Sequence, residues 1–181
     1  MNIAIFGGSF DPIHIGHIEI VESAIERLDI DKLIVVPTFL NPFKESFLAQ
    51  PRVRLGWIEE VLGGREKVEV SDFEIKQNRP TPSITTVEHF KKKLNPKKIY
   101  LIIGADNLSS LHKWRDFEKL KQIVEFVVAT REGFKIPKEY KKLVVDVDIS
   151  SSDLRANIDE KFLPNRISHK IKKHITDRER T

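Results

Sequence analysis

The fold is decided by the stretch IAIFGGSFDPIHIGH, residues 3–17. It begins with four apolar residues, Ile3 to Phe6, and an apolar run without alternation is typical of a strand buried on both faces. The pair Gly7-Gly8 then predicts a tight turn. Apolar residues follow at positions 18, 21, 25 and 28, which is the spacing of a helix. A strand, a tight turn and a helix in this order begin a βαβ unit.

The remainder of the chain repeats this alternation. Further strands are expected at Leu33–Val36, Val68–Val70, Ile99–Ile103, Val124–Ala129 and Leu143–Val147, and helices at Arg52–Leu62, Thr85–Leu94, Phe117–Gln122, Ser151–Ile158 and Pro164–His174. The pattern predicts an α/β fold whose doubly wound parallel sheet carries helices on both faces. We expect one domain over residues 1–181, ending in a short helical segment from about residue 150 to 181. The least patterned stretches, 38–51 and 77–82, follow strands, where such folds place ligand loops.

The composition excludes several classes of protein. The chain has 181 residues, of which 40% are hydrophobic and 32% charged, as in ordinary globular proteins. It contains no cysteine, which rules out a disulfide scaffold, a thiolate metal site and a cysteine nucleophile. No apolar run approaches the ~20 residues of a membrane span. The N-terminal stretch MNIAIFGG enters the first strand without a basic leader region, so we expect a cytoplasmic protein without a membrane partner.

The charge is mildly basic, with 31 Lys and Arg against 27 Asp and Glu and a net charge of +4. Much of the excess is local, in Lys91–Lys93, Lys97–Lys98, Lys141–Lys142 and the tail from Lys170 to Arg180. Such runs suit phosphate-bearing small molecules or nucleic acid, but they are more often simply the solvated face of a protein. No basic run is interleaved with aromatic residues and no nucleic-acid motif is present, so we expect no nucleic-acid partner.

The first turn carries the most informative polar residues. Gly7 and Gly8 let the backbone pass close to a ligand, and a helix start adds free N–H donors and a partial positive charge. His14 and His17 lie three residues apart, near one face of the first helical turn, and Ser9 adds a hydroxyl. These groups form a phosphate cradle. The alternatives are a tight turn with ordinary capping, or a zinc site on the two histidines, for which no third ligand is evident.

A second polar segment follows the last expected strand. It is ISSSDLR, residues 149–155. Serines before a helix cap it and leave N–H groups free, and Arg155, one turn further on, has a fork of donors that matches phosphate. Taken alone, the segment is also compatible with an ordinary helix cap. Together with the first turn, it predicts two anion sites that flank one polyphosphate.

These segments resemble the signatures of a known superfamily. The motif at His14–His17 is similar to the HxGH motif of nucleotidyltransferases, and Ile149–Arg155 resembles their second signature, Ile-Ser-Ser-Thr-x-x-Arg, with Ser152 in place of Thr. Within the superfamily, Gly7–His14 and the stretch from Gly104 to Trp114 resemble the bacterial nicotinate-nucleotide adenylyltransferases. The likeness runs from Ile3 to about His174. It implies the Rossmann-like version of the doubly wound fold.

The resemblance also implies a reaction and a set of site residues. The reaction is transfer of AMP from ATP to nicotinate mononucleotide, with Mg²⁺ carried by the ATP, no metal bound by the protein itself, and no covalent intermediate. The sequence leaves the oligomeric state undetermined, and a homo-oligomer is compatible with it. The implied catalytic residues are His14, His17 and Arg155. The implied ATP-binding residues are Gly7, Gly8, Ser9, Phe10, Gly104, Asp106, Ser150, Ser151 and Ser152. The implied mononucleotide-binding residues are Lys44, Thr85 and Trp114.

The chain departs from the family pattern at two positions on the mononucleotide side. Phe43 stands where the family commonly has a histidine before a basic residue, and Ile84 replaces the tyrosine of a Pro-Ser-Tyr-Thr element. The sequence favours this function over three others. Phosphopantetheine adenylyltransferases carry Thr-x-Gly-His in place of the first motif, class I aminoacyl-tRNA synthetases need a longer chain, and a nucleotide sensor without activity is disfavoured by two intact signatures.

Overall fold

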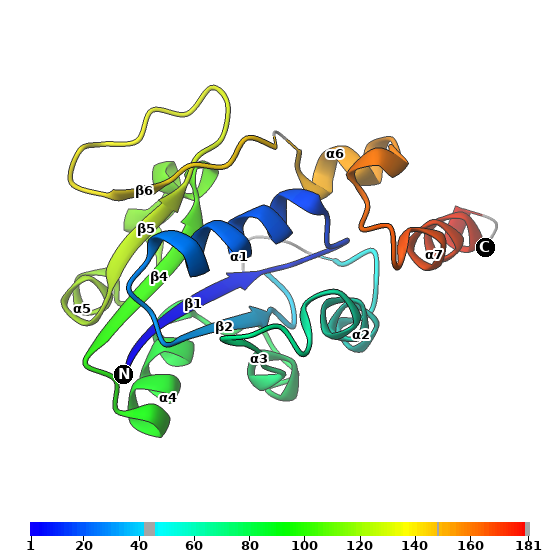
Figure 1. Ribbon diagram of the computed structural model, residues 1–181. Coiled ribbons are helices and arrows are strands. Elements are labelled where there is room, and N and C mark those ends of the chain that lie inside the picture. The colour runs from blue at the N-terminus through cyan, green and yellow to red at the C-terminus, as the bar shows by residue number, and fades with distance from the viewer. Residues whose placement is uncertain (42–45, 148, 180–181) are drawn as a thin grey trace.

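A parallel sheet forms the centre of the molecule (Figure 1). The computed structural model describes residues 1–41, 46–147 and 149–179, and within them the strands run in the order β3 (Val68–Val70), β2 (Lys32–Pro37), β1 (Asn2–Gly8), β4 (Lys98–Gly104), β5 (Glu125–Ala129) and β6 (Lys141–Leu143). All neighbouring strands are parallel. Because β1 pairs with both β2 and β4, the chain winds outward from it in two directions. The predicted doubly wound α/β fold is confirmed.

Helices cover both faces of this sheet. On one face lie α1 (Ile15–Arg27) and α2 (Pro51–Leu62). The same layer is extended by α6 (Ser151–Ala156) and α7 (Ser168–Glu179), which the short turn η2 (Glu160–Phe162) separates along the chain. On the other face lie α3 (Phe73–Lys76), α4 (Ser83–Leu94), η1 (Ala105–Lys113) and α5 (Phe117–Ile123). No helix in the described part of the chain is long and apolar enough to cross a membrane.

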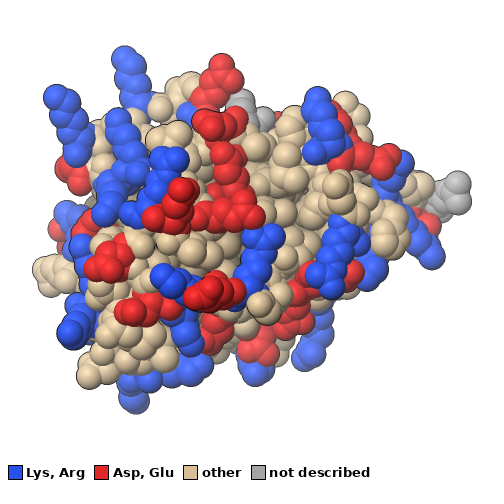
Figure 2. All heavy atoms as spheres, viewed as in Figure 1, with Lys and Arg blue, Asp and Glu red and all other residues tan. Residues whose placement is uncertain are grey.

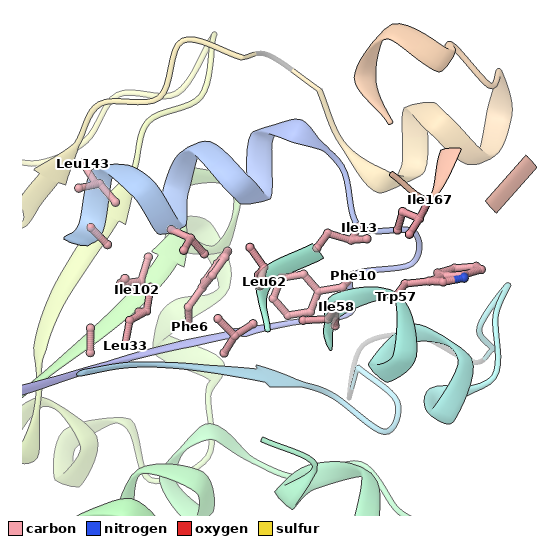
Figure 3. Close-up of a cluster of buried hydrophobic side chains, with 14 of the residues drawn as sticks. Phe6, Phe10, Ile13, Leu33, Trp57, Ile58, Leu62, Ile102, Leu143 and Ile167 are labelled. Atoms are coloured by element: carbon pink, nitrogen blue, oxygen red, sulfur yellow. The ribbon is translucent and has the colours of Figure 1, made fainter. Parts of the chain in front are cut away.

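The four central strands, β2, β1, β4 and β5, each contribute to two hydrophobic clusters, one on either side of the sheet. In β1, Ala4 and Phe6 belong to the cluster under α1 and α2, which Figure 3 shows in close-up, and Ile3 and Ile5 belong to the cluster over α4 and α5. All four are buried. Burying one such side chain stabilises a fold by about 1.5–3 kcal/mol. This two-sided burial explains why the strands appear in the sequence as continuous apolar runs.

The expected strand at Leu143–Val147 is wrong, because β6 ends at Leu143. Beyond it, side chains of other elements take the backbone N–H groups. The N–H of Val145 donates to Thr130 Oγ1 (2.8 Å), and the N–H groups of Asp146 and Val147 donate to the two carboxylate oxygens of Glu19 (2.8 and 3.0 Å). The pattern of apolar residues cannot reveal that the carboxylate of Glu19 on α1 accepts the backbone hydrogen bonds that a neighbouring strand would otherwise accept.

Several other boundaries also differ from expectation. The last helix begins at Ser168 rather than Pro164, and the one before it ends at Ala156 rather than Ile158. Three short elements, α3, η1 and η2, were not expected. The elements α3 and η2 have four and three residues, too few to show a helical period, and η1 is a 3-10 helix, whose period differs from that of an α-helix.

Charged side chains cover the outer surface in mixed fashion. On the face drawn in Figure 2, Lys and Arg are interspersed with Asp and Glu. Lysines of the basic runs take part in this pattern: Lys98 pairs with Glu125 (2.6 Å) and Lys170 with Glu60 (2.6 Å). Exposed pairs of this kind contribute about 0–1 kcal/mol each. Their main consequence is a polar, charge-mixed surface.

The loops at the carboxyl edge of the sheet are joined by one buried cation, Arg54 of α2. Its guanidinium is 1% exposed and donates to four backbone carbonyls. These are Ser9 O in the turn after β1 (2.5 Å), Thr38 O and Phe39 O in the loop after β2 (2.8 Å each), and Ala49 O before α2 (3.0 Å). The arginine therefore holds the first turn against the neighbouring loop.

Replacing this cation should destabilise the protein. The substitution Arg54→Met keeps an apolar side chain of similar length but leaves buried carbonyls without donors. We expect the free energy of unfolding to fall by about 3 kcal/mol, measured by urea denaturation. Arg52→Met, an exposed position on the same helix, is the matched control and should change stability by less than about 0.5 kcal/mol. Equal stability of the two variants would contradict the role given to Arg54.

Candidate active site

A cavity of about 760 Å³ lies at the carboxyl edge of the sheet. Its walls include Gly7–Phe10 after β1, Gly104–Asn107 around the end of β4, Ala129–Arg131 at the end of β5, and Ser150–Asp153 at the start of α6. The strand order reverses between β1 and β4, and doubly wound sheets bind ligands at such a point. The two polar segments of the sequence thus meet in one cleft, although more than 130 residues separate them.

The turn after β1 is built around Phe10. This residue has a left-handed backbone (φ +47°) and a buried ring, which packs edge-on against Phe6 (5.3 Å between centroids) and at a tilt against His17 (4.7 Å). A Cβ atom at Gly8 would lie 3.1 Å from the Phe10 ring, so this position needs glycine. Phe10 therefore lines the cleft as the support of the turn and of His17.

The two predicted histidines form a stacked pair at the start of α1. Their ring centroids lie 3.6 Å apart with an interplanar angle of 28°. The backbone N–H of His14, the N-cap residue, donates to Nδ1 of His17 (3.2 Å). The space for the His14 ring depends on Gly16, where a Cβ atom would lie 3.1 Å from Nδ1 and 3.2 Å from Cε1 of that ring. The glycine of the HxGH motif thus has a steric reason, which is the space that the His14 ring occupies.

Both imidazoles are neutral at pH 7. Burial lowers the pKa of His14 to about 3, with the positive charge of Arg131 acting in the same direction and Asp153 opposing it. Burial and the neighbouring His14 hold the pKa of His17 well below its usual value of 6.5. Because Nδ1 of His17 accepts a hydrogen bond, a neutral ring carries its proton on Nε2. His17 is then a neutral donor fixed in one orientation.

The start of α6 is tied to the first turn. Ser151 Oγ donates to Pro12 O (2.9 Å), and Arg155 donates through Nη1 to Asp11 O (2.7 Å) and through Nη2 to Ser152 Oγ (2.8 Å). Ser150 caps the helix, with Oγ accepting from the N–H of Asp153 (3.1 Å). The three serines line the cleft, whereas Arg155 lies behind them and does not line it.

Arg131 was not among the predicted site residues, yet it lines the cleft. It follows β5, its guanidinium lies 3.5 Å from the Asp153 carboxylate, and its charge reaches His14. The sequence around it, Thr130-Arg131-Glu132-Gly133, matches no motif. Its place directly after a predicted strand was the one available signal, because side chains in that position meet at the ligand edge of the sheet.

The end of β4 supplies a third wall. A Cβ atom at Gly104 would collide with Oδ1 of Asp106, so a side chain at this position would displace that carboxylate. Asn107 Nδ2 donates to Gly104 O (3.3 Å), which closes the turn. Asp106 is exposed, and Trp114, at the far end of η1, is partly buried; both line the cleft. The structure therefore brings these predicted residues together with the histidines and serines.

Of the described mononucleotide contacts that were predicted, Thr85 is not among the cleft-lining residues. The helix α4 turns Ile84 into the core and leaves Thr85 exposed, while Thr81 and Pro82 just before it, and its first residue Ser83, do line the cleft. Ile84 thus fills space in the core at the position where the family pattern has tyrosine. Lys44, together with Phe43, lies outside the described residues.

The cleft also gathers the unsatisfied polar groups of the protein. Among the described residues, five buried side-chain nitrogen or oxygen atoms lack a hydrogen-bond partner, and four of them belong to cleft-lining residues. The four atoms are His14 Nδ1, Thr38 Oγ1, Glu74 Oε2 and Trp114 Nε1. Buried polar groups are rarely left without a partner. Their concentration in one cavity indicates groups that a ligand satisfies.

Comparison with known proteins identifies similar chains. A family model described as cytidylyltransferase-like matches residues 5–157. The probable nicotinate-nucleotide adenylyltransferase of Nitratiruptor sp. is 52% identical over 171 residues, covering 94% of this chain and 97% of that protein. The probable nicotinate-nucleotide adenylyltransferase of Campylobacter jejuni is 50% identical over 174 residues, covering 96% of each chain.

A solved structure shows the same likeness in three dimensions. The Plasmodium falciparum nicotinic acid mononucleotide adenylyltransferase complexed with NaAD superimposes with a TM-score of 0.77 at 27% identity, covering 97% of both chains. The likeness therefore spans the sheet, the cleft and the helices that follow.

The histidine pair leads to a prediction that needs no ligand. In an NMR titration the ring signals of His14 should stay unchanged from pH 8 to pH 5, because its pKa is about 3. The unfolded chain takes up this proton near pH 6.5, so acidification favours unfolding, by about 1.4 kcal/mol per pH unit below 6.5. Urea denaturation at pH 7 and 5 should show a smaller loss in His14→Asn than in the wild type. A His14 midpoint near pH 6.5 would contradict the burial of a neutral ring.

Proposed function

Since the chain belongs to the cytidylyltransferase-like family, as one of its nicotinate-nucleotide adenylyltransferases, we propose that the cleft transfers the adenylyl group of ATP to nicotinate mononucleotide. The products are nicotinate adenine dinucleotide (deamido-NAD) and pyrophosphate, in NAD biosynthesis. The observation that carries this assignment to the cleft is the meeting of two neutral imidazoles, a serine-lined helix start and Arg131 around one cavity at the β1–β4 edge.

The chemistry needs positioning and charge neutralisation more than acid–base groups. A phosphate oxygen of the mononucleotide attacks the α-phosphorus of ATP in line, and pyrophosphate leaves with the bonding electron pair. The nucleophile is already an anion, so no protein base has to activate it. Donors held in place before the reaction stabilise the charge that develops on the phosphate oxygens. A partly dry cleft strengthens each of these interactions.

His14 and His17 supply two of these donors. The Nε2–H of His17 can donate to an ATP phosphate because its Nδ1 is held by the backbone N–H of His14. His14 Nδ1, which has no hydrogen-bond partner among the described residues, is proposed to bind the same ligand. As neutral rings they donate without adding charge. Gly7, Gly8 and Ser9 offer the backbone and hydroxyl groups of the turn beside them.

The start of α6 is the proposed site of the β- and γ-phosphates. Ser151 and Ser152 contribute hydroxyl groups, and Ser150 caps the helix whose start faces the cleft. Arg155 does not line the cleft, and its hydrogen bonds to Asp11 O and Ser152 Oγ give it the proposed role of holding the first turn and Ser152 in position. Arg131, in the loop after β5, adds a guanidinium that lines the cleft beside the start of α6. Its present partner, Asp153, is an exposed carboxylate that phosphate can replace.

The other walls are proposed to hold the two nucleosides. Gly104 and Asp106, after the central strand β4, suit ribose hydroxyls between the two substrates, and Trp114 offers an aromatic face to the pyridine ring. Backbone groups at the start of α4, near Thr85, suit the carboxylate of nicotinate. Lys44 remains the proposed contact to the phosphate of the mononucleotide.

Magnesium enters this reaction as part of the substrate. The described residues contain no group of three or more His, Cys, Asp or Glu side chains that could hold a metal ion. The donors of the cleft are mainly hydroxyl, imidazole and guanidinium groups, which suit phosphate oxygens better than a bare Mg²⁺ ion. We propose that the nucleotide substrate is Mg·ATP, in which the metal ion would neutralise part of the phosphate charge.

The test of this function is pyrophosphate release from Mg·ATP. Nicotinate mononucleotide, nicotinamide mononucleotide and phosphopantetheine are offered in parallel at equal concentrations. We expect the highest kcat/KM with nicotinate mononucleotide, together with formation of the dinucleotide detected by chromatography. Comparable values for both mononucleotides would change the assignment to dual specificity. Activity with phosphopantetheine alone, or with none of the three, would refute the function.

The steric role of Gly16 gives a sharper prediction about the cleft. Gly16→Ala should displace the His14 ring by a few tenths of an ångström and lower kcat about tenfold, because catalysis here depends on positioning. Alanine is the better helix former, so the variant should not lose stability. The matched control is Gly56→Ala on α2, where a Cβ atom meets nothing within 4 Å. Wild-type kcat in Gly16→Ala would show that the position of His14 does not limit the reaction.

A further inference from the structure

Glu74 is a buried carboxyl group that the proposed mechanism does not use. It lies on α3, is 4% exposed and lines the active-site cavity. Its Oε1 accepts a hydrogen bond from the hydroxyl of Thr86 on α4 (2.5 Å), whereas its Oε2 is buried and has no hydrogen-bond partner among the residues that the structure describes. A half-satisfied carboxyl group in a protein interior is costly. Its position in a ligand cavity suggests that the ligand supplies the missing partner.

The cavity has two chemically different ends. The end near α1 and α6 holds the histidines, the serines and Arg131, which suit phosphate. The end on the opposite face of the sheet holds Glu74, the segment Thr81–Ser83 before α4, and Trp114. Trp114 also carries an unpartnered buried N–H, so this end combines an aromatic surface with two unsatisfied polar groups. That combination suits a flat heterocycle bearing a polar substituent.

Resting on the proposed function, we propose that Glu74 is a specificity-determining residue, whose Oε2 forms a hydrogen bond with the acid or amide substituent on the pyridine ring of the mononucleotide. A protonated Glu74 donates to the carboxylate of nicotinate. An ionised Glu74 repels that carboxylate and instead accepts a hydrogen bond from the amide N–H of nicotinamide. The protonation state of one side chain therefore selects between the two substrates.

The surroundings of Glu74 bring the change between its protonated and its ionised form close to neutral pH. Burial raises its pKa to about 7, and the hydrogen bond from Thr86 acts in the opposite direction. The elements around it carry several charged and titratable groups. On α4 these are His89 and Lys93, and at the cavity wall they are Lys113, the last residue of η1, and Arg115 just after it. Asp72, just before α3, pairs with Lys76 on that helix (2.9 Å). The ring of His89 stacks on Phe73 (3.9 Å between centroids), and burial, followed by Lys93, lowers its pKa.

The experiment measures kcat/KM for both mononucleotides with Mg·ATP from pH 6 to pH 8. The ratio of the nicotinate value to the nicotinamide value is the readout, because both substrates carry the same phosphate and its titration cancels. A group with a pKa of about 7 changes its protonated fraction roughly tenfold over this range. In the wild type the ratio should therefore fall at least tenfold as the pH rises. A ratio that stays constant would overturn the proposal.

Variants identify the titrating group. In Glu74→Gln the ratio should be constant within about twofold, because the amide cannot ionise. Thr86→Val removes the hydrogen bond that favours the charged form, so the fall should move to higher pH. Glu88→Gln, an exposed position on α4, is the matched control and should behave as the wild type does. A fall in Glu74→Gln equal to that of the wild type would assign the effect elsewhere and overturn the proposal.

The remaining outcomes are also decisive. Thermal melting establishes whether each variant folds. Should Glu74→Gln fail to fold, Thr86→Val decides: an unshifted midpoint overturns the role of Glu74. Absence of turnover with either mononucleotide in the wild type would instead overturn the proposed function, and this inference with it. An active wild type with a constant ratio overturns only the inference.

Discussion

The structure depends on one buried cation that satisfies the backbone of irregular loops. Ser9 in the turn after β1, and Thr38 and Phe39 just after β2, are partly buried at the edge of the sheet and lie outside its strands. Arg54 donates to the carbonyl groups of these three residues and of Ala49, and is itself 1% exposed. Asp11 completes the arrangement by accepting the N–H groups of Leu48 and Ala49 (2.7 and 2.9 Å). The cleft keeps its shape because its loops are anchored from behind.

This anchoring leaves the front of the cleft free for a ligand. The first turn is held by Arg54 on one side and by Ser151 and Arg155 on the other, so the histidines stand on a rigid base. Burial keeps both rings neutral, and several buried polar atoms of the cleft have no partner within the described part of the chain. A cavity of this kind is preorganised: its donors are oriented and partly desolvated before a substrate arrives. That is the arrangement that in-line transfer between two phosphates requires.

Much of this could be predicted from the sequence, where the signal is local. The apolar run Ile3–Phe6 and the later strands indicated a doubly wound sheet, because two-sided burial leaves a continuous hydrophobic pattern. The expectation failed where distant side chains replace regular pairing, as at Val145–Val147, whose N–H groups bond to Thr130 and Glu19. It also missed Arg131 and Glu74, which belong to no motif and become site residues only through the packing of their elements.

By itself, the sequence determined the order of strands and helices, the phosphate-binding turn at Gly7–His17 and the serine-rich helix start at Ser150–Ser152. These features depend on residues that are neighbours along the chain, so spacing and residue type suffice to find them. Only the tertiary structure decided that both segments share one cleft, that Phe10 supports the turn, and that Glu74 is buried beside the aromatic end. These facts depend on burial and on contacts between distant elements. Both are properties of the packed molecule, and no local pattern records them.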